Sequence, residues 1–160
     1  MDIDTLAGAY RRLTSAARRV AGSDALSTAD WAQIDWTLSH VLLSDAMLAE
    51  TARRMLAGEP ASIDNSGAMD TSAISTLIDT TSHAERIVMV SDNADRLVDL
   101  IGRMPGESAA VLVPTRLVDR AGKEVLNDTL RWGDLVKARG TEQIPGHAAR
   151  LEGFARTAMN

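Results

Sequence analysis

The stretch STADWAQIDWTLSHVLLSDAMLAETARRML, residues 27–56, has the signals of one long helix and decides the fold. Ser27 is suited to cap its start with Asp30 at the capping-box position, and Gly58 with Pro60 ends it. One face carries Trp31, Ile34, Leu38, Val41, Leu42, Ala49 and Leu56, and a nearly opposite face carries Trp36, His40, Leu43 and Met47. A helix that is apolar on two sides contacts neighbours on both sides, which predicts a position inside a helical bundle.

Three further helices are predicted, one before this stretch and two after it. Apolar residues from Ile3 to Val20 recur at steps of three and four, and Gly22 suits the end of that helix. A third helix is expected over residues 72–104, before Pro105. A fourth is expected from about Leu130 to near the end of the chain.

The segments between the helices have turn and strand signals. Residues 58–70 are rich in Gly, Pro, Ser, Asn and Asp, which is typical of a loop. Residues 110–118 contain two short β-rich runs and are followed by a turn-like segment over 119–123, which predicts a small hairpin or an extended crossover. We therefore expect an all-α fold, a four-helix bundle with that crossover between helices 3 and 4, as one domain over residues 1–160.

Composition excludes several classes of protein. The 160 residues contain no cysteine, which excludes a disulfide framework, a thiolate metal site and a cysteine nucleophile. The formal net charge of -5 and an aromatic content of 3% argue against a nucleic-acid partner. No apolar run is long enough for a membrane span and the first residues do not resemble a signal peptide, so we expect a cytoplasmic protein with no membrane partner.

The three histidines are the candidate site residues. His40, His83 and His147 each lie on or beside an apolar helical face. Histidine is the commonest metal ligand, and helical bundles build metal sites from inward side chains on facing helices. The alternative is three separate histidines, each hydrogen-bonded to a carbonyl or a carboxylate inside the protein.

The neighbours of His147 leave the identity of a third ligand open. Gln143 lies four residues earlier, so both side chains project from the same helix face, but a neutral amide is a poor Zn²⁺ ligand. Glu142 lies about 140° around a regular helix from His147, and only a bulge at Pro145 and Gly146 would turn it inward. Pro145 itself predicts a kink or a brief break before His147.

Several short motifs resemble a known family. Trp36-Thr37-Leu38-Ser39-His40-Val41 followed by Asp45 is similar to the W-x-x-x-H-hydrophobic-x-x-x-D/E segment of the DinB-like superfamily. Gly122, then Leu130-Arg131-Trp132, then Gly146-His147-Ala148-Ala149-Arg150-Leu151 follow in the same order. Within that superfamily the chain most resembles the mycothiol-dependent maleylpyruvate isomerase-like group, over nearly its whole length.

The resemblance implies a fold and a metal site. It implies an up-down-down-up four-helix bundle, often a homodimer, with one divalent metal held by three ligands from the second and fourth helices. His40 matches the second-helix ligand and His147 the last ligand of the fourth helix. Gln143 falls on the middle ligand, where the family has Glu or His, and Glu142 or His83 is the alternative third ligand.

Two functions remain open from the sequence. The first is a transferase or isomerase that depends on a divalent metal (Zn or Ni) and on a low-molecular-weight thiol of the mycothiol type, with a small-molecule substrate. The metal would lower the pKa of a bound thiol or water. The alternative is a catalytically degenerate, metal-free bundle that binds a small molecule or a protein partner, as Gln143, Pro145 and Gly146 suggest.

Overall fold

The computed structural model describes residues 1–160. Its helices and strands are α1 (Ile3–Arg19), α2 (Thr28–Leu56), β1 (Ile63–Asp64), α3 (Thr71–Thr80), α4 (His83–Gly102), β2 (Leu112–Val118), β3 (Glu124–Arg131), α5 (Trp132–Ala138) and α6 (Ile144–Ala158). Short 3₁₀ turns follow β1 (Ser66–Ala68) and α4 (Gly106–Ala110), and a π-helical turn (Arg139–Gln143) joins α5 to α6.

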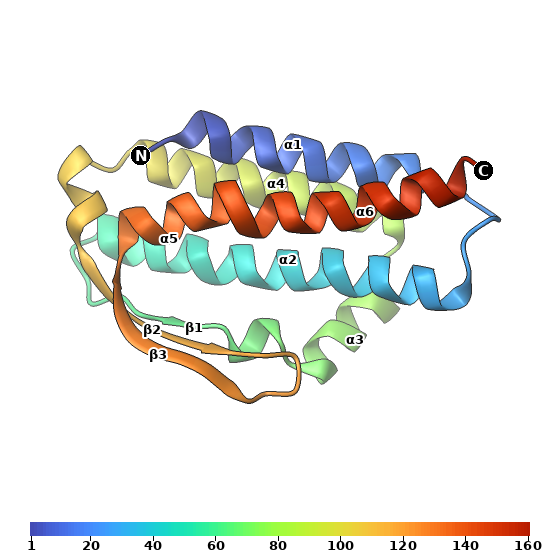
Figure 1. Cartoon of the computed structure of the whole chain (residues 1–160). Helices are drawn as coiled ribbons and strands as arrows, with labels where there is room; N and C mark the ends of the chain where they lie inside the picture. The colour runs from blue at the N-terminus through green and yellow to red at the C-terminus, as the bar shows by residue number, and fades with distance from the viewer.

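The long helices lie side by side and enclose the apolar core. Figure 1 shows α1, α2, α4 and the continuous α5–α6 segment packed together, with the strands and α3 against the outer side of α2. The predicted long helix is confirmed at residues 28–56, with the capping box of Ser27 and Asp30 formed at its start. Leu13, Leu38, Val90 and Leu151 come from four different helices and are each fully buried in one core cluster.

The expectation of an all-α four-helix bundle is wrong. The chain forms a three-stranded mixed sheet in the order β1-β2-β3, so the fold combines helices with a sheet. β2 and β3 pair antiparallel over the region expected as a hairpin or crossover, and β1 pairs parallel to β2 with Ile63 opposite Thr115. β1 lies in the segment expected to be a loop. It was missed because two residues carry no periodicity of their own, and pairing with a strand some fifty residues later defines them.

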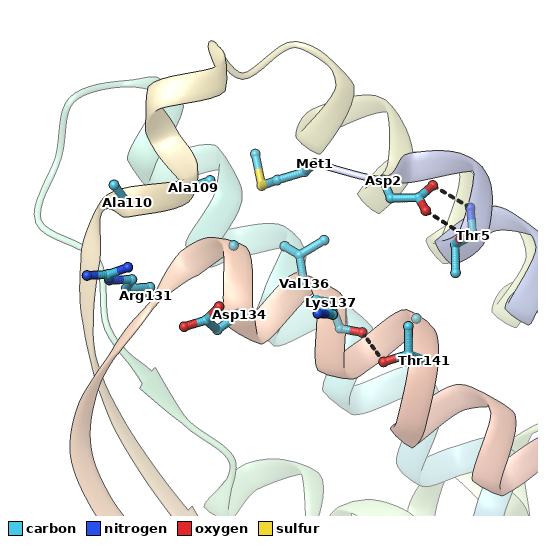
Figure 2. A pocket seen from close by; sticks show the side chains of 12 residues that line it. Met1, Asp2, Thr5, Ala109, Ala110, Arg131, Asp134, Val136, Lys137 and Thr141 are labelled. Carbon is cyan, nitrogen blue, oxygen red and sulfur yellow. Dashed lines mark hydrogen bonds between the residues drawn. The ribbon is translucent and has the colours of Figure 1, made fainter.

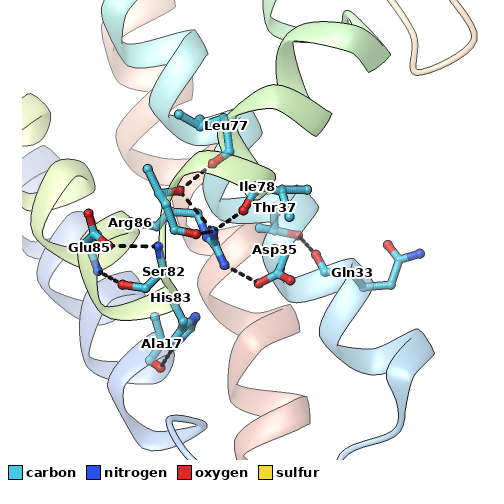
Figure 3. A network of polar contacts seen from close by, with 11 residues as sticks. Ala17, Gln33, Asp35, Thr37, Leu77, Ile78, Ser82, His83, Glu85 and Arg86 are labelled. Atoms are coloured by element: carbon cyan, nitrogen blue, oxygen red, sulfur yellow. Dashed lines mark hydrogen bonds and ion pairs between the residues drawn. The ribbon is translucent and has the colours of Figure 1, made fainter.

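The expected third helix is two helices. α3 ends at Thr80, Thr81 is extended, and α4 begins at His83 with a capping box between Ser82 and Glu85. The buried guanidinium of Arg86 holds this corner: Nη1 donates to the Thr81 carbonyl at 2.6 Å and Nη2 donates to Asp35 Oδ1 at 2.8 Å (Figure 3). The Ser-x-x-Glu spacing is a local signal for this helix start.

The fourth helix begins later and is less regular than expected. Residues up to Arg131 belong to β3, and the wider π turn over residues 139–143 precedes Pro145. Proline cannot donate its backbone nitrogen, and its ring crowds the carbonyl four residues earlier, so a wider turn at that place relieves the conflict. Gly140 in this turn lets α1 approach closely, since a Cβ there would lie 3.2 Å from Leu6 Cα.

None of the helices combines the length and the apolarity that crossing a membrane requires.

Candidate functional site

Two of the three histidines line one cavity of about 240 Å³. Its wall comes from the middle of α2, from the segment between β1 and α3, from β2 and from the α5–α6 region. The lining residues are His40, Ser44, Met47, Leu48, Ile63, Asn65, Met69, Leu117, Leu135, Arg139, Gln143 and His147. The cavity therefore lies where α2, α6 and the edge of the sheet meet, a place that exists only because β1 and β2 pack beside α2.

His40 is held with one ring nitrogen free. The ring is buried, and Nδ1 lies 2.8 Å from the carbonyl oxygen of Ala68. Because a carbonyl only accepts hydrogen bonds, Nδ1 carries the proton and Nε2 keeps its lone pair. Trp36, one helical turn earlier, stacks on the ring with 4.8 Å between centroids, and this fixes its plane.

His147 lies edge-on to His40 with 5.6 Å between the ring centroids. Its Nδ1 is buried and has no hydrogen-bond partner in the protein. An unpaired polar atom in the interior costs about 1–3 kcal/mol, so an acceptor, a donor or a cation at this ring would offset that cost. The structure thus brings together the two imidazoles that the family resemblance implies as a pair of ligands.

The separation of the two rings suits a shared ion. Imidazoles that bind one ion through nitrogen at about 2.0–2.1 Å have centroids roughly 4.5–5.5 Å apart. The observed 5.6 Å lies just above this range, so a small rotation of either ring would bring both nitrogens to one ion. The hydrogen bond from His40 Nδ1 to a backbone carbonyl is also the usual outer contact of a metal-binding histidine, because it orients the ring.

Both imidazoles are neutral at physiological pH. Burial lowers the pKa of His40, and the charges of Arg139, Arg120 and Arg150 lower it further against the effect of the Ala68 hydrogen bond. Burial lowers the pKa of His147 to about 3, with added repulsion from His40, Arg139 and Arg150. Neutral rings can act as ligands or as hydrogen-bond acceptors without first losing a proton.

The depressed pKa of His147 predicts a pH-dependent stability. In the unfolded chain an imidazole binds a proton near pH 6.5, whereas His147 in the folded chain binds one only near pH 3. Protons therefore favour the unfolded state, and we expect the free energy of unfolding to fall as the pH is lowered from 6.5 toward 5. Urea denaturation in the presence of EDTA measures this, and His147→Leu should give a shallower fall. Equal slopes for both proteins would contradict the pKa assignment.

A buried charged network lies behind the cavity. Arg139 in the π turn is 4% exposed and Asp45 on α2 is fully buried, and Nη2 of Arg139 donates to Asp45 Oδ1 at 2.7 Å. The Tyr10 hydroxyl from α1 donates to the same Asp45 oxygen, and Arg139 Nε lies 3.3 Å from the Tyr10 oxygen. Arg139 Nη1 donates to Gln143 Oε1 at 3.2 Å. The network thus connects α1, α2 and the π turn to the rim of the cavity.

The other candidate ligands lie elsewhere. Glu142 is exposed and is not part of the cavity wall, so the irregular turn brings Gln143 and not Glu142 to the site. His83 does not line this cavity: its Nε2 bonds to the Ala17 carbonyl at 2.7 Å (Figure 3). Its ring packs edge-on against Trp31. His83 fits the alternative reading of a histidine that is hydrogen-bonded to a carbonyl inside the protein.

Sequence reasoning missed Arg139 and Asn65. The i and i+4 spacing of Arg139 and Gln143 was available as a signal, but an isolated arginine near a helix end is usually exposed. Asn65 lines the cavity and fixes β1 to β2, since its amide bonds to both the backbone nitrogen and the carbonyl of Val118. No local pattern identifies that role, because it depends on a strand far along the chain.

A second cavity, of about 490 Å³, lies between the start of α1, the turn after α4 and the start of α5 (Figure 2). Its polar groups are exposed or already hydrogen-bonded within the protein. Asp2 caps α1 by accepting from Thr5, and the Thr141 hydroxyl donates to the Lys137 carbonyl. It contains no buried titratable side chain. The cavity of His40 and His147 is therefore the better candidate for chemistry.

No group of three or more His, Cys, Asp or Glu side chains is placed to hold a metal ion. No protein-family model, no curated protein and no solved structure matches the chain.

Proposed function

We propose that the cavity binds a divalent metal ion through His40 and His147 and that the protein is a transferase or isomerase dependent on a low-molecular-weight thiol. The observation that carries the proposal is the pair of neutral rings 5.6 Å apart, one of them oriented by a carbonyl. The resemblance to mycothiol-dependent maleylpyruvate isomerases supplies the reaction class. The proposal places the protein in the cytoplasm, where small thiols are kept reduced.

The residues present fit a metal ion in part. The two imidazoles suit Zn²⁺ or Ni²⁺, and the buried Nδ1 of His147 has no partner in the protein. Gln143 Oε1 already accepts a hydrogen bond from Arg139, so it is a weak third ligand. The remaining coordination positions of the ion would be filled by small molecules. When bound, the ion would act as a Lewis acid and lower the pKa of a thiol or water.

The side chains of this cavity also define what the small molecule meets. Met47, Leu48, Leu117 and Leu135 give part of the wall an apolar character, and the buried Ser44 also lines the cavity. A volume of about 240 Å³ lies below the roughly 300–1,000 Å³ of drug-sized sites, so the reacting part of the substrate is small.

We expect the protein to bind Zn²⁺ or Ni²⁺ at one site per chain, and His40→Ala and His147→Ala each to weaken that binding at least tenfold, about 1.4 kcal/mol. Isothermal titration of untagged, EDTA-treated protein measures the affinity. His83→Ala is the matched control, because His83 lies outside the cavity. Metal binding that is absent, or that survives in both variants, would contradict the proposal.

The second candidate is a metal-free cavity that binds a small molecule. The position of the Arg139 guanidinium favours it, because this buried positive group lies at the cavity wall while its partner Asp45 does not line the cavity, and a positive group there opposes a bare cation. In that case both histidine variants would retain most of their small-molecule binding, and added metal would not change it.

A further inference from the structure

The side-chain amide of Gln143 has a fixed orientation. Arginine has only donors, so the atom of Gln143 that lies 3.2 Å from Arg139 Nη1 must be the amide oxygen. The amide nitrogen then points away from Arg139 with its two hydrogens, and no protein atom accepts them. Gln143 lines the cavity one helical turn before His147, so these hydrogens are available to a molecule that also contacts His147.

Arg139 is itself held in place, so the orientation of the Gln143 amide is fixed. Its guanidinium is buried and is fixed by Asp45 at 2.7 Å and by Tyr10 at 3.3 Å. Arg139 and Gln143 are the first and last residues of the π turn, and a hydrogen bond joins their side chains. Asp45 balances the charge of Arg139, so the pair can be buried without an ion from outside.

We propose that Gln143 is a ligand-binding residue that donates a hydrogen bond to the acceptor group of a small organic anion, and that Arg139 is the positioning residue that turns the amide nitrogen toward that anion. The inference rests on the cavity of the proposed function and names the class of molecule it takes: a small carboxylate with a short apolar tail. The tail contacts Met47 and Leu135 on the wall, and the charged group lies at the rim between Gln143 and the imidazoles.

The surroundings favour an anion over a neutral acceptor. The guanidinium of Arg139 lies at the cavity wall, with its Nη1 atom 3.2 Å from Gln143 Oε1. No carboxylate lines the cavity, so nothing on its wall repels a negative group. A hydrogen bond to a charged acceptor is stronger than one to a neutral acceptor, which adds to the selectivity.

The test uses propionate as the probe and propionamide as its neutral isostere, titrated into the EDTA-treated full-length protein and followed by ¹⁵N–¹H NMR. The chain has two glutamines, so Gln143→Met identifies the Gln143 side-chain signals and Gln33→Met is the matched control. We expect propionate to shift the Gln143 amide signals and to bind at least fivefold more tightly than propionamide. Gln143→Met should weaken propionate about tenfold, whereas Gln33→Met should leave it unchanged.

Arg139→Lys tests the positioning role. Lysine keeps a positive charge beside Asp45 but has one ammonium group and cannot hold both Asp45 and Gln143 as the guanidinium does. We expect this variant to remain folded by circular dichroism, to shift the Gln143 amide signals without ligand, and to lose the preference for propionate. If Arg139→Lys fails to fold, the comparison of Gln143→Met with Gln33→Met tests the inference.

Three results would overturn the inference: no propionate binding to the wild-type protein, equal affinity for propionamide, or full propionate affinity in Gln143→Met. These outcomes are separate from the proposed metal site. If metal binding depends on His40 and His147, the proposed function stands. If propionate affinity is also unchanged in Gln143→Met, this inference alone is removed. Propionate selectivity without metal binding would do the reverse.

Discussion

Gln143→Glu is expected to raise the affinity for Zn²⁺ by about 100-fold, or about 2.7 kcal/mol. The side chain lies on the cavity wall with His40 and His147, and a carboxylate there would complete a set of two imidazoles and one carboxylate. Such a set is typical of catalytic zinc sites, and it also supplies the negative charge that the cavity wall lacks. Isothermal titration of the EDTA-treated variant and the wild-type protein measures the change.

The control for this substitution is Gln33→Glu, which adds the same charge at an exposed position on α2. We expect it to leave the affinity for Zn²⁺ within about twofold of the wild-type value, because the new carboxylate does not line the cavity, lies beside the Arg120 guanidinium and is screened by salt. The same Gln143→Glu variant should lose propionate binding through repulsion of like charges. An unchanged Zn²⁺ affinity in Gln143→Glu would show that the two rings do not converge on one ion.

Arg139→Met is expected to lower the free energy of unfolding by about 3–5 kcal/mol, because it leaves Asp45 as a buried carboxylate without its cation. Asp45 is fully buried, and its Oδ2 already lacks a partner, so no water replaces the lost ion pair at low cost. For a chain of this length the loss corresponds to a decrease in Tm of roughly 6–20 °C. Thermal and urea denaturation measure it.

Arg103→Met is the matched control for the loss of an ion pair. Arg103 also pairs with an aspartate, Asp99, but its side chain is 65% exposed. Exposed ion pairs contribute about 0–1 kcal/mol, so we expect a small change in this variant. The double variant Asp45→Leu, Arg139→Met should recover part of the stability, since no charge remains buried. A loss in Arg139→Met no larger than in Arg103→Met would mean that the network does not stabilise the fold.

Gln143→Glu and Arg139→Met separate the effects on binding from the effects on stability. Gln143 is exposed at the rim, so changing it should affect what the cavity binds and leave the fold intact. Arg139 connects the rim to the buried carboxylate of Asp45, so removing it should affect both. This arrangement explains why a charged side chain lies among apolar helices: its position fixes the amide of Gln143 as well as the packing of the π turn.

Much of the helical structure could be predicted from local patterns. Ser27 and Asp30 cap α2 as their spacing indicates, and the same kind of signal at Ser82 and Glu85 marks the start of α4, although it was read as the interior of one longer helix. The period of apolar residues predicted most of the buried faces, although Leu56 at the end of α2 is 38% exposed. These signals work because helix hydrogen bonds and caps join residues three to five positions apart.

The candidate site could be predicted only in part. The sequence placed His40 and His147 on inward faces, and the structure brings their rings together. It did not indicate that Asn65 would border the cavity, or that Arg139 would occupy the oxygen of Gln143. Whether two inward residues meet depends on how far each helix is rotated, and the spacing of apolar residues leaves that rotation undetermined.

The sequence by itself determined the long helices, most of their ends and the apolar faces, because each depends on interactions within a few neighbouring residues. The tertiary structure decided that β1 and β2 pair into a sheet beside α2, that His83 lies apart from the other histidines, and that Arg139 meets Asp45 and Gln143. All of these but the Arg139–Gln143 contact join residues far apart in the chain. Such contacts are fixed only when the whole core packs, since their energy comes from burial that no single segment achieves alone.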